Sequence, residues 1–305
     1  MRTLHQTHYG WDNSIPPIAE IASGDELDFE IGEASGGQIV KASQVGALAS
    51  LDFAKINAVT GPVFVKGAEP GDVLEAEIRA IDGADWGWTA IIPGFGLLHE
   101  EYPEPWLQIW DVGKDVATGI PGVAIPVRRF PGTIGVALAE PGAHSIVPPR
   151  ENGGNMDIRH LTKGVKVYLP VWVKGALFSA GDPHAAQGDG EVCGVAIESP
   201  ATIALRFRLI KGYSIDEPQY EVPAASALQP DRAGYHVTTG ICDDLHEAAR
   251  KSVRSMIAHL MRERGYDRSE AYTLCSVAVD LKISEIVDSP NWCVSAFLPR
   301  SIFTS

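Results

Sequence analysis

Apolar and polar residues alternate in short runs through the first 130 residues, with turn residues between the runs. Two phrases repeat this pattern, PPIAEIASGDELDFEI at 16–31 and VKGAEPGDVLEAEI at 65–78. Each places Gly-Asp, a tight-turn pair, before an alternation of period two, which is the repeat of a half-buried antiparallel strand. The pattern predicts an antiparallel β sandwich or barrel-like N-terminal part.

A second β-rich block runs from about residue 131 to 222. Its clearest predicted strands lie in GVKVYLPVWVKGA (164–176) and ATIALRFRLIKG (201–212), which are rich in β-branched and aromatic residues. Between them, residues 181–194 carry three acids, a His and four Gly, too polar for a core strand throughout. We therefore predict an N-terminal β domain over 1–130 and a β-rich domain over 131–305 that carries the candidate site.

Helical periodicity appears only near the C-terminus. Residues 243–264 place apolar side chains at three- and four-residue spacings, open with acids and close with Arg before Gly265. A second helix is expected over 269–278, followed by an edge strand around 292–298. The predicted fold class is α+β and predominantly β, with a central β block carrying the site and helices at the C-terminal end.

Composition and charge limit the classes of molecule that the protein is expected to bind. The formal net charge of −14 gives no electrostatic attraction to nucleic acid or an anionic membrane, so we expect a small neutral substrate. The first residues lack an apolar signal-peptide core, and no apolar run reaches the length of a bilayer span. Four widely spaced Cys without a C-x-x-C pair indicate reduced thiols. We expect a cytoplasmic homo-oligomer, a dimer or tetramer, without a membrane or nucleic-acid partner.

The strongest candidate chemistry lies in three short segments, 155–157, 182–184 and 188–191. They combine carboxylates and an imidazole on Gly-rich backbone, the ligands of a catalytic divalent cation. Asp182 and His184 are two residues apart, so an extended strand would direct both side chains to one face. The alternative is that Gly-Asp-Gly and Asp-Pro simply form turns. The spacing alone leaves both interpretations open.

Several phrases together resemble the acetamidase/formamidase family: PRENGGNMDIRHL, GDPHAAQGDGEVCGVAIE, AVTGPVFVKGAEPGDVLEAEI and SVAVDLKISEIVD. Their order matches the family from about residue 8 to 299. The resemblance implies an amidohydrolase that converts short aliphatic amides, such as formamide and acetamide, to the carboxylic acid and ammonia. It also implies a bound divalent cation, with zinc as first choice and Ca²⁺, Mn²⁺ or Fe²⁺ as alternatives.

The family motifs fall on particular residues of this chain. Asp157, Asp182 and His184 are the implied metal ligands, and the metal would lower the pKa of a bound water from about 16 towards about 7. Glu191 is our first choice for the general base and Glu198 the second. Asn155 or the backbone N–H groups of the Gly153-Gly154 turn are candidate donors to the oxyanion.

Two positions bear on specificity. Met156 stands where formamidase-like members carry His, which argues against a purely formamide-specific enzyme. Ala58 replaces an expected Pro in the loop from Asn57 to Pro62, which puts substrate preference in doubt more than reaction type. The alternatives are hydrolysis of a lactam or another cyclic amide at the same site, or a non-catalytic relative that binds metal or a small molecule.

The remaining candidates have simpler interpretations. His99, in His-Glu-Glu, lacks the second His of a zincin helix and lies among prolines, so we expect a loop. His144 and His160 flank the Asp157 segment and are candidate partners of the ligands. Cys193 is expected to be a buried, inert thiol. A group of aromatic residues could wall a pocket, form an interface or fill the core: Trp86, Trp88, Phe95, Tyr102, Trp106 and Trp110.

Overall fold

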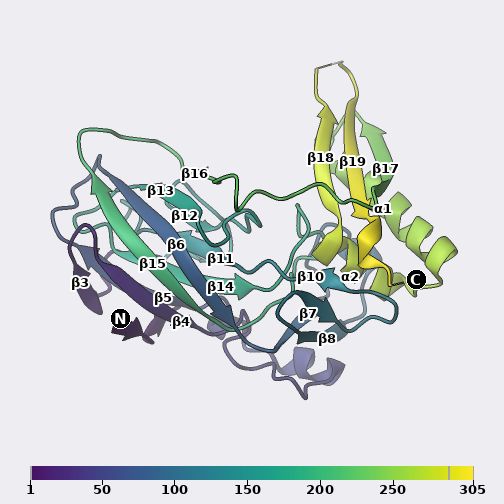
Figure 1. The fold of residues 1–305 in the computed structure, drawn as a ribbon, viewed down its shortest axis with the longest axis horizontal. Coiled ribbons are helices and arrows are strands. Elements are labelled where there is room, and N and C mark those ends of the chain that lie inside the picture. Colours follow the sequence, from purple (N-terminus) through teal and green to yellow (C-terminus); the bar gives the residue numbers. More distant parts are fainter. Residues whose placement is uncertain (1, 288, 305) are drawn as a thin grey trace.

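The computed structural model describes residues 2–287 and 289–304. Two six-stranded sheets pack against each other in one half of the molecule (Figure 1). The first sheet has the spatial order β1 (Arg2–Leu4), β4 (Glu26–Ile31), β15 (Ala201–Ile210), β6 (Val73–Gly83), β13 (Lys166–Pro170) and β16 (Gln219–Glu221). The second runs β12 (Gly153–Asn155), β11 (Phe130–Gly135), β14 (Phe178–His184), β5 (Val59–Val65) and β2 (Thr7–His8), with β3 (Ala19–Ile21) also on β5.

Successive side chains of a strand point to opposite faces of its sheet. The side chains on the inward faces of the two sheets therefore meet in one apolar core. Phe29 of β4, Phe207 of β15 and Phe178 of β14 meet there, with ring centroids 4.9–6.1 Å apart. All three side chains are fully buried, and truncating one to Ala in such a core costs about 3–5 kcal/mol. This sandwich confirms the predicted β-dominated fold and holds β11, β12 and β14, which carry the site.

Both sheets combine strands from the two sides of residue 130. In the first sheet β4 pairs with β15, and in the second β5 pairs with β14. Most pairings are antiparallel as expected, while β1–β4 and β3–β5 are parallel. The division into 1–130 and 131–305 stays a prediction, but the sandwich itself draws on both ranges.

Two smaller sheets lie beside the sandwich. One has the order β10 (Ile125–Pro126), β9 (Val116–Thr118), β8 (Trp106–Val112) and β7 (Trp86–Ile91). The other has the order β17 (Tyr235–Cys242), β19 (Trp292–Pro299) and β18 (Asp280–Glu285). The segment 292–298 is therefore a strand, but the prediction of an edge position was wrong, because β17 and β18 pair with β19 on its two sides.

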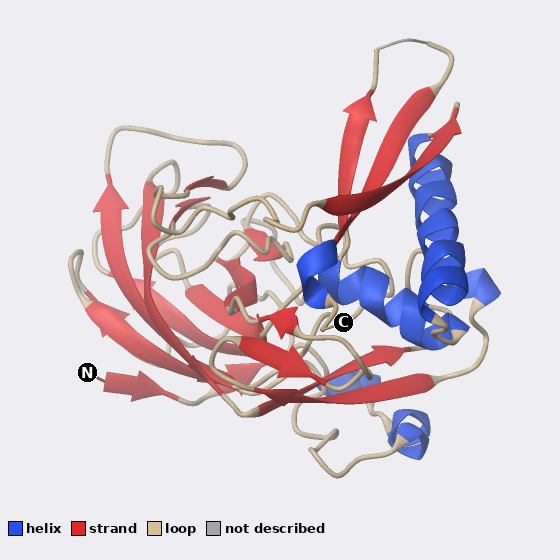
Figure 2. Cartoon of the chain, turned by 45° about the vertical axis from the view of Figure 1, so that its right-hand side comes forward, coloured by secondary structure: helices blue, strands red, loops and turns tan. Residues whose placement is uncertain are grey.

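Both predicted helices are present, as α1 (Leu245–Arg264) and α2 (Arg268–Ala278). Asp244 caps α1 by accepting from the Glu247 N–H, and Gly265 ends it in the left-handed conformation. Asp267 and Glu270 form a capping box at the start of α2. Figure 2 shows α1 beside the three-stranded sheet and α2 across its base.

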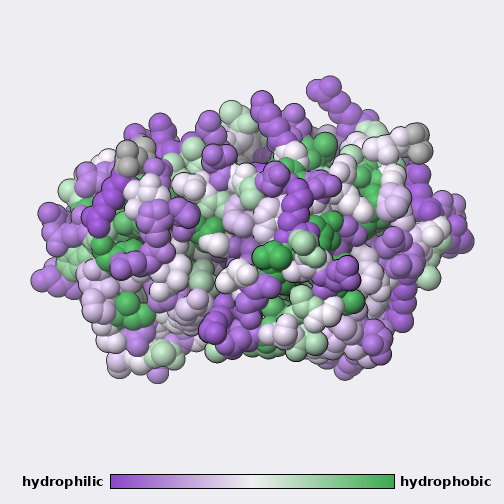
Figure 3. Space-filling view, turned by 90° about the horizontal axis from the view of Figure 1, so that it is seen from below, coloured by the Kyte–Doolittle hydropathy of each residue, from purple (hydrophilic) through white to green (hydrophobic). Residues whose placement is uncertain are grey.

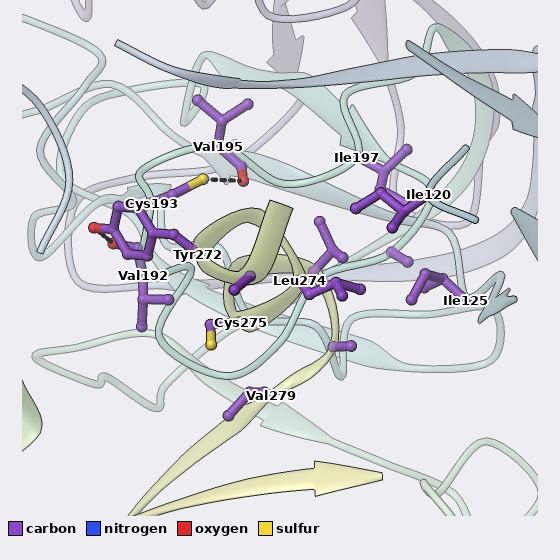
Figure 4. Packing of buried hydrophobic residues seen from close by; sticks show 14 of the residues in the cluster. Ile120, Ile125, Val192, Cys193, Val195, Ile197, Tyr272, Leu274, Cys275 and Val279 are labelled. Atoms are coloured by element: carbon purple, nitrogen blue, oxygen red, sulfur yellow. Dashed lines mark hydrogen bonds between the residues drawn. The ribbon is translucent and has the colours of Figure 1, made fainter. Parts of the chain in front are cut away.

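Helix α2 lies at the centre of the second apolar core, where every residue from Ala271 to Ala278 is buried. Its Tyr272 lies beside Val192, from the segment after β14 (Figure 4). This packing ties the C-terminal helices to the segment that carries Gln187 and Glu191. Four 3-10 helices complete the described elements: η1 (Val45–Ser50), η2 (Phe53–Lys55), η3 (His99–Glu101) and η4 (Arg300–Ile302).

The surface mixes residue types. On the face seen in Figure 3, apolar side chains form separate small groups among polar ones. Among the described residues, neither α-helix combines the length and the apolar character needed to cross a bilayer. The homo-oligomer and the cytoplasmic location stay predictions.

Candidate active site

The site forms where three adjacent strands of the second sheet end. Strand β11 pairs with β12 on one side and β14 on the other, so Thr133 lies opposite both Asn155 and Gly181. This pairing brings Asp157, just beyond β12, next to Asp182 and His184 on β14. The convergence expected for Asp182 and His184 is confirmed, with Asp182 Oδ1 3.4 Å from His184 Nε2.

Glu198 joins these residues from the loop that follows β14. Its backbone pairs with Trp88 of β7, and it also forms a β-bridge with His184. Its Oε2 lies 3.1 Å from His184 Nε2, while its Oε1 accepts from the Ala196 N–H at 2.9 Å. Glu198 therefore lies against the imidazole, in a position suited to a ligand as well as to a base.

Three acids of the site have a left-handed backbone: Asp157 at φ 50°, Asp182 at φ 54° and Glu191 at φ 42°. This region is uncommon for residues other than Gly, and such strain concentrates at functional sites. Its occurrence at three neighbouring acids supports a function for the cluster beyond turn formation.

His184 directs its Nε2 towards two carboxylates, those of Asp182 and Glu198. The Gln187 side chain donates from Nε2 to the Asp157 carbonyl at 2.8 Å, so its Oε1 faces His184 Nδ1 at 3.0 Å. Because an amide oxygen only accepts, the imidazole proton lies on Nδ1. His184 Nε2 lies between two carboxylate oxygens, and in the neutral imidazole it would offer its lone pair to a bound cation.

The donor set fits a divalent cation. Two overlapping groups have ligand atoms within 4.8 Å of one another, Asp182/His184/Glu198 and Asp157/His184/Glu191. Four buried atoms of the site lack a hydrogen-bond partner among the described residues: Asp157 Oδ1, Asp182 Oδ1, His184 Nε2 and Glu198 Oε2. Buried polar atoms are rarely left unpaired, and these four converging atoms form a donor set that a divalent cation would satisfy.

Burial and the repulsion between neighbouring carboxylates change the pKa values of the acids in the site. Burial raises the pKa of Asp157 to about 7 and that of Glu198 to about 8. Burial, followed by the charge of Asp157, raises the pKa of Glu191 well above its usual value. Burial also pushes the pKa of Asp182 up, but the neighbouring His184 outweighs this and holds it below the usual value. Bringing all these carboxylates into one buried site as anions requires a compensating positive charge.

Asn155 is at the site, but its donors are engaged. Its Nδ2 donates to Asp157 Oδ2 at 3.1 Å and to the Val147 carbonyl at 3.3 Å, and its Oδ1 accepts from Thr133 Oγ1 at 2.6 Å. This network orients Asp157. A role for Asn155 as oxyanion donor stays a prediction, since that donation would require one of these bonds to open.

Two residues that contact the candidate ligands, Gly132 and Phe130, were not predicted from the sequence. A Cβ on Gly132 would lie 2.6 Å from Asp157 Oδ1 and 2.9 Å from His184 Cε1, so only Gly leaves room for the side chains there. Phe130 meets the His184 ring edge-on with centroids 5.0 Å apart. Neither residue lies in a recognisable motif, and the signal is the pairing of β11 with β14.

A cavity of about 690 Å³ opens above these residues. Its base includes Asn155, Asp157, Asp182, Glu191 and Glu198. Its walls come from distant segments and are largely apolar: Leu51, Phe53, Ile56, Trp88, Ile92, Pro93, Phe95, Val147, Met156 and Val195. Asn57 also lines it, so the loop preceding Pro62 lies at the site as predicted.

The aromatic residues of the Trp-rich segment divide between two roles. Trp88 and Phe95 line the cavity, whereas Trp110 and Tyr102 are buried in the core. Trp86 and Trp106 pack against that core and are partly buried.

The other candidates lie outside the cavity lining. His144 pairs with Trp11 and does not line the cavity, and His99 opens a short 3-10 helix rather than an irregular loop. Cys193 is buried, with its thiol directed at the Val195 carbonyl (Figure 4), and burial raises its pKa to about 12. The burial predicted for Cys193 is therefore confirmed, and its inertness stays a prediction.

Comparisons with known proteins identify related chains. The model of the Acetamidase/Formamidase family matches residues 2–141 and 137–305. A formamidase from Methylophilus methylotrophus is 30% identical, with 98% of this chain and 89% of that protein covered. An acetamidase from Mycolicibacterium smegmatis is 32% identical over 67% of this chain and 66% of that protein.

Solved structures show the same fold. A gamma lactamase from Delftia acidovorans superposes with a TM-score of 0.91 at 30% identity, covering 98% of this chain and 90% of that one. An acetamidase from Bacillus halodurans gives a TM-score of 0.69 at 30% identity, covering 97% and 96%. Together with the family match along the whole chain, these likenesses establish that the chain is an amidohydrolase belonging to the acetamidase/formamidase family.

Proposed function

We propose that the chain hydrolyses neutral carboxamides, of the acetamide and formamide type, to the carboxylic acid and ammonia with the aid of a divalent cation. The observation that carries this proposal is the convergence of His184 Nε2 with Asp182 Oδ1 and Glu198 Oε2 at 3.4 and 3.1 Å. These three side chains are fully buried and would hold the cation. Asp157, with an unpaired Oδ1 beside them, stays a candidate fourth ligand.

A cation bound there would polarise a carbonyl oxygen and lower the pKa of water. Zinc is our first choice, following the family resemblance, and the mixed carboxylate–imidazole set also suits Mn²⁺, Fe²⁺ or Ca²⁺.

Glu191 is positioned to act as general base. It lines the cavity, retains some exposure to it, and has a pKa raised by burial and by the charge of Asp157, which favours proton uptake by this carboxylate. In the proposed reaction Glu191 takes a proton from water as the water oxygen bonds to the amide carbon. It returns that proton to the nitrogen as the C–N bond breaks, which releases ammonia and leaves the acid.

Ring opening of a lactam is the second candidate. The same C–N cleavage applies to a cyclic amide, and the Delftia acidovorans gamma lactamase is similar at a TM-score of 0.91. The cavity of about 690 Å³ also has room for a ring. A relative that binds metal without catalysis is the remaining alternative.

The test is a substrate panel with and without metal. We expect ammonia from formamide, acetamide and propionamide, loss of that activity after chelation, and its return with Zn²⁺. Ring opening of 2-pyrrolidone is followed separately through its product, 4-aminobutanoate. Activity that survives complete removal of metal would refute the role of the cation, and a metal-bound protein silent on every amide would refute hydrolysis.

A further inference from the structure

The cavity is much larger than the smallest amides. Acetamide has four heavy atoms and, at the ~30 Å³ that each water takes in the liquid, would need roughly 120 Å³. The cavity measures about 690 Å³, within the range of about 300–1,000 Å³ typical of sites for drug-sized ligands. An acetamide molecule at the metal-ligand cluster would leave most of this space filled with water.

The space beyond the cluster is apolar. Leu51, Phe53 and Ile56 line it from one segment, and Ile92 and Phe95 from another. Asp182 and Glu198 are buried whereas Phe53 and Phe95 are 59% and 47% exposed, so the acids lie deep and the apolar side chains lie nearer the surface. A substrate with its carboxamide at the acids would direct its acyl group towards these apolar side chains. Burying hydrocarbon against them stabilises the complex by about 0.8 kcal/mol per methylene.

Part of this wall is built in place before any substrate binds. The Trp88 indole donates from Nε1 to Glu33 Oε2 at 2.7 Å, and the same buried carboxylate accepts from the Ser35 and Gly37 N–H groups. This network fixes Trp88. Phe95 is 47% exposed, yet it lies directly over Gly194, where a Cβ would come within 2.5 Å of its ring.

Charge excludes acidic acyl groups. Among the described residues that line the cavity there is no Lys or Arg. The lining does include four acids, Asp157, Asp182, Glu191 and Glu198. A carboxylate on the acyl group of the substrate would meet an apolar wall and carry its charge near these acids. Its desolvation would then go uncompensated.

We propose that the substrate class of this site is neutral carboxamides whose acyl group is a bulky branched or cyclic hydrocarbon, which rests on the amide hydrolysis proposed above. Small amides occupy only the base of the cavity. The larger acyl group displaces water from the apolar wall and holds the carboxamide against Glu191.

The experiment compares kcat/KM for acetamide, butyramide and cyclohexanecarboxamide on the metal-loaded protein. At about fourfold per fully buried methylene, we expect at least a tenfold rise from acetamide to cyclohexanecarboxamide. The matched charged probe, trans-4-carboxycyclohexanecarboxamide, should lose at least tenfold relative to cyclohexanecarboxamide. Equal values for the neutral and the charged ring would overturn the proposal.

A variant tests the wall directly. Phe95→Ala should lower the ratio of kcat/KM for cyclohexanecarboxamide over acetamide by about fivefold or more, because it removes ring contacts that only the large substrate makes. Tyr213→Ala is the matched control, since Tyr213 is exposed to a similar extent, 55%, and lies outside the cavity lining. A ratio that changes equally in both variants would contradict a role for the wall.

The outcomes separate the two proposals. Turnover of acetamide with flat kcat/KM across the series would overturn the substrate class and leave amide hydrolysis standing. Calorimetric titration of the same amides tests the opposite case. If there is no turnover but cyclohexanecarboxamide binds more tightly than acetamide, the cavity preference is supported and hydrolysis is overturned. If the protein shows no turnover and also no preferential binding of cyclohexanecarboxamide, both proposals are overturned.

Discussion

Arg159 and Asp280 form an ion pair that joins two loops of the site to the C-terminal sheet. Their side chains are only 18% and 15% exposed. Arg159 lies two residues after Asp157, and Asp280 begins β18. Asp280 Oδ1 also accepts from the N–H of Asp189 at 3.2 Å, two residues before Glu191. The pair therefore positions a candidate ligand and the candidate base from one carboxylate.

Asp280→Asn should uncouple this connection while keeping an acceptor for the Asp189 N–H. Leaving one partner of a buried ion pair uncompensated costs about 3–5 kcal/mol, so the free energy of unfolding should fall by up to that amount. We also expect kcat to fall by roughly tenfold, more than KM changes, because the site loops shift. Glu263→Gln, which breaks an exposed pair with Arg262, is the control and should change neither quantity.

Gln187→Leu should weaken metal binding without removing a ligand. The substitution deletes the acceptor for His184 Nδ1, which fixes the tautomer, and such partners of ligands are worth about 10–100-fold in metal affinity. Metal titration of the stripped protein measures this, and excess metal should restore much of the activity. Gln229→Leu, at an exposed glutamine away from the site, serves as control. Wild-type affinity in the Gln187 variant would argue against the tautomer assignment.

Replacing Glu191 or Glu198 by Gln should show which of the two acts as general base and which as metal ligand. Glu191→Gln should lower kcat by about 10²–10⁴-fold and leave metal content intact, since it removes only proton transfer. Glu198→Gln should instead lose metal, because its Oε2 lies against His184 Nε2. Metal content by elemental analysis together with kcat decides between them, and the reverse pattern would exchange the two roles.

Gly132→Ala should abolish metal binding in a folded protein. The added methyl would lie within 3 Å of both Asp157 and His184, so the ligands must move apart. Gly46→Ala, where a Cβ meets nothing within 4 Å, is the matched control. Circular dichroism confirms folding, and full metal content in the Gly132 variant would show that the ligands lie elsewhere.

The metal-free protein should lose stability as the pH rises from about 5 to 8. Asp157 and Glu198 have folded pKa values of about 7 and 8, above those of an unfolded chain, so protonation favours the folded state. This contribution is fully present below about pH 4 and is lost as the pH passes through 7 and 8. The raised pKa of His184 acts in the same direction.

Metal should reverse this trend, because it binds the deprotonated ligands. The difference in Tm between zinc-loaded and chelator-treated protein should therefore grow from pH 5 to pH 8. Thermal melts at three pH values measure it. A metal-free Tm that is constant or rises over this range would contradict the assignment of these acids to one buried site.

Local patterns were sufficient for much of the secondary structure. The period of two in 26–31 and 73–78 lies within β4 and β6, and the helical spacing in 243–264 corresponds to α1. These features depend on neighbours in the chain, which impose the alternation of a strand or the turn of a helix. The candidate ligands could also be recognised in the sequence motifs, which contain His184 and the acids that surround it. This was possible because only a few residue types can hold a cation.

Only the tertiary structure decided what lies next to what. The central place of β19 depends on β17, more than fifty residues earlier, and a single strand sequence does not encode its partners. Gly132 matters because β11 passes beneath Asp157, and Trp88 lines the cavity because Glu33 holds its indole. Sequence chemistry thus determined which residues could react. Long-range strand pairing, which depends on the packing of whole sheets, decided their geometry and the shape of the space above them.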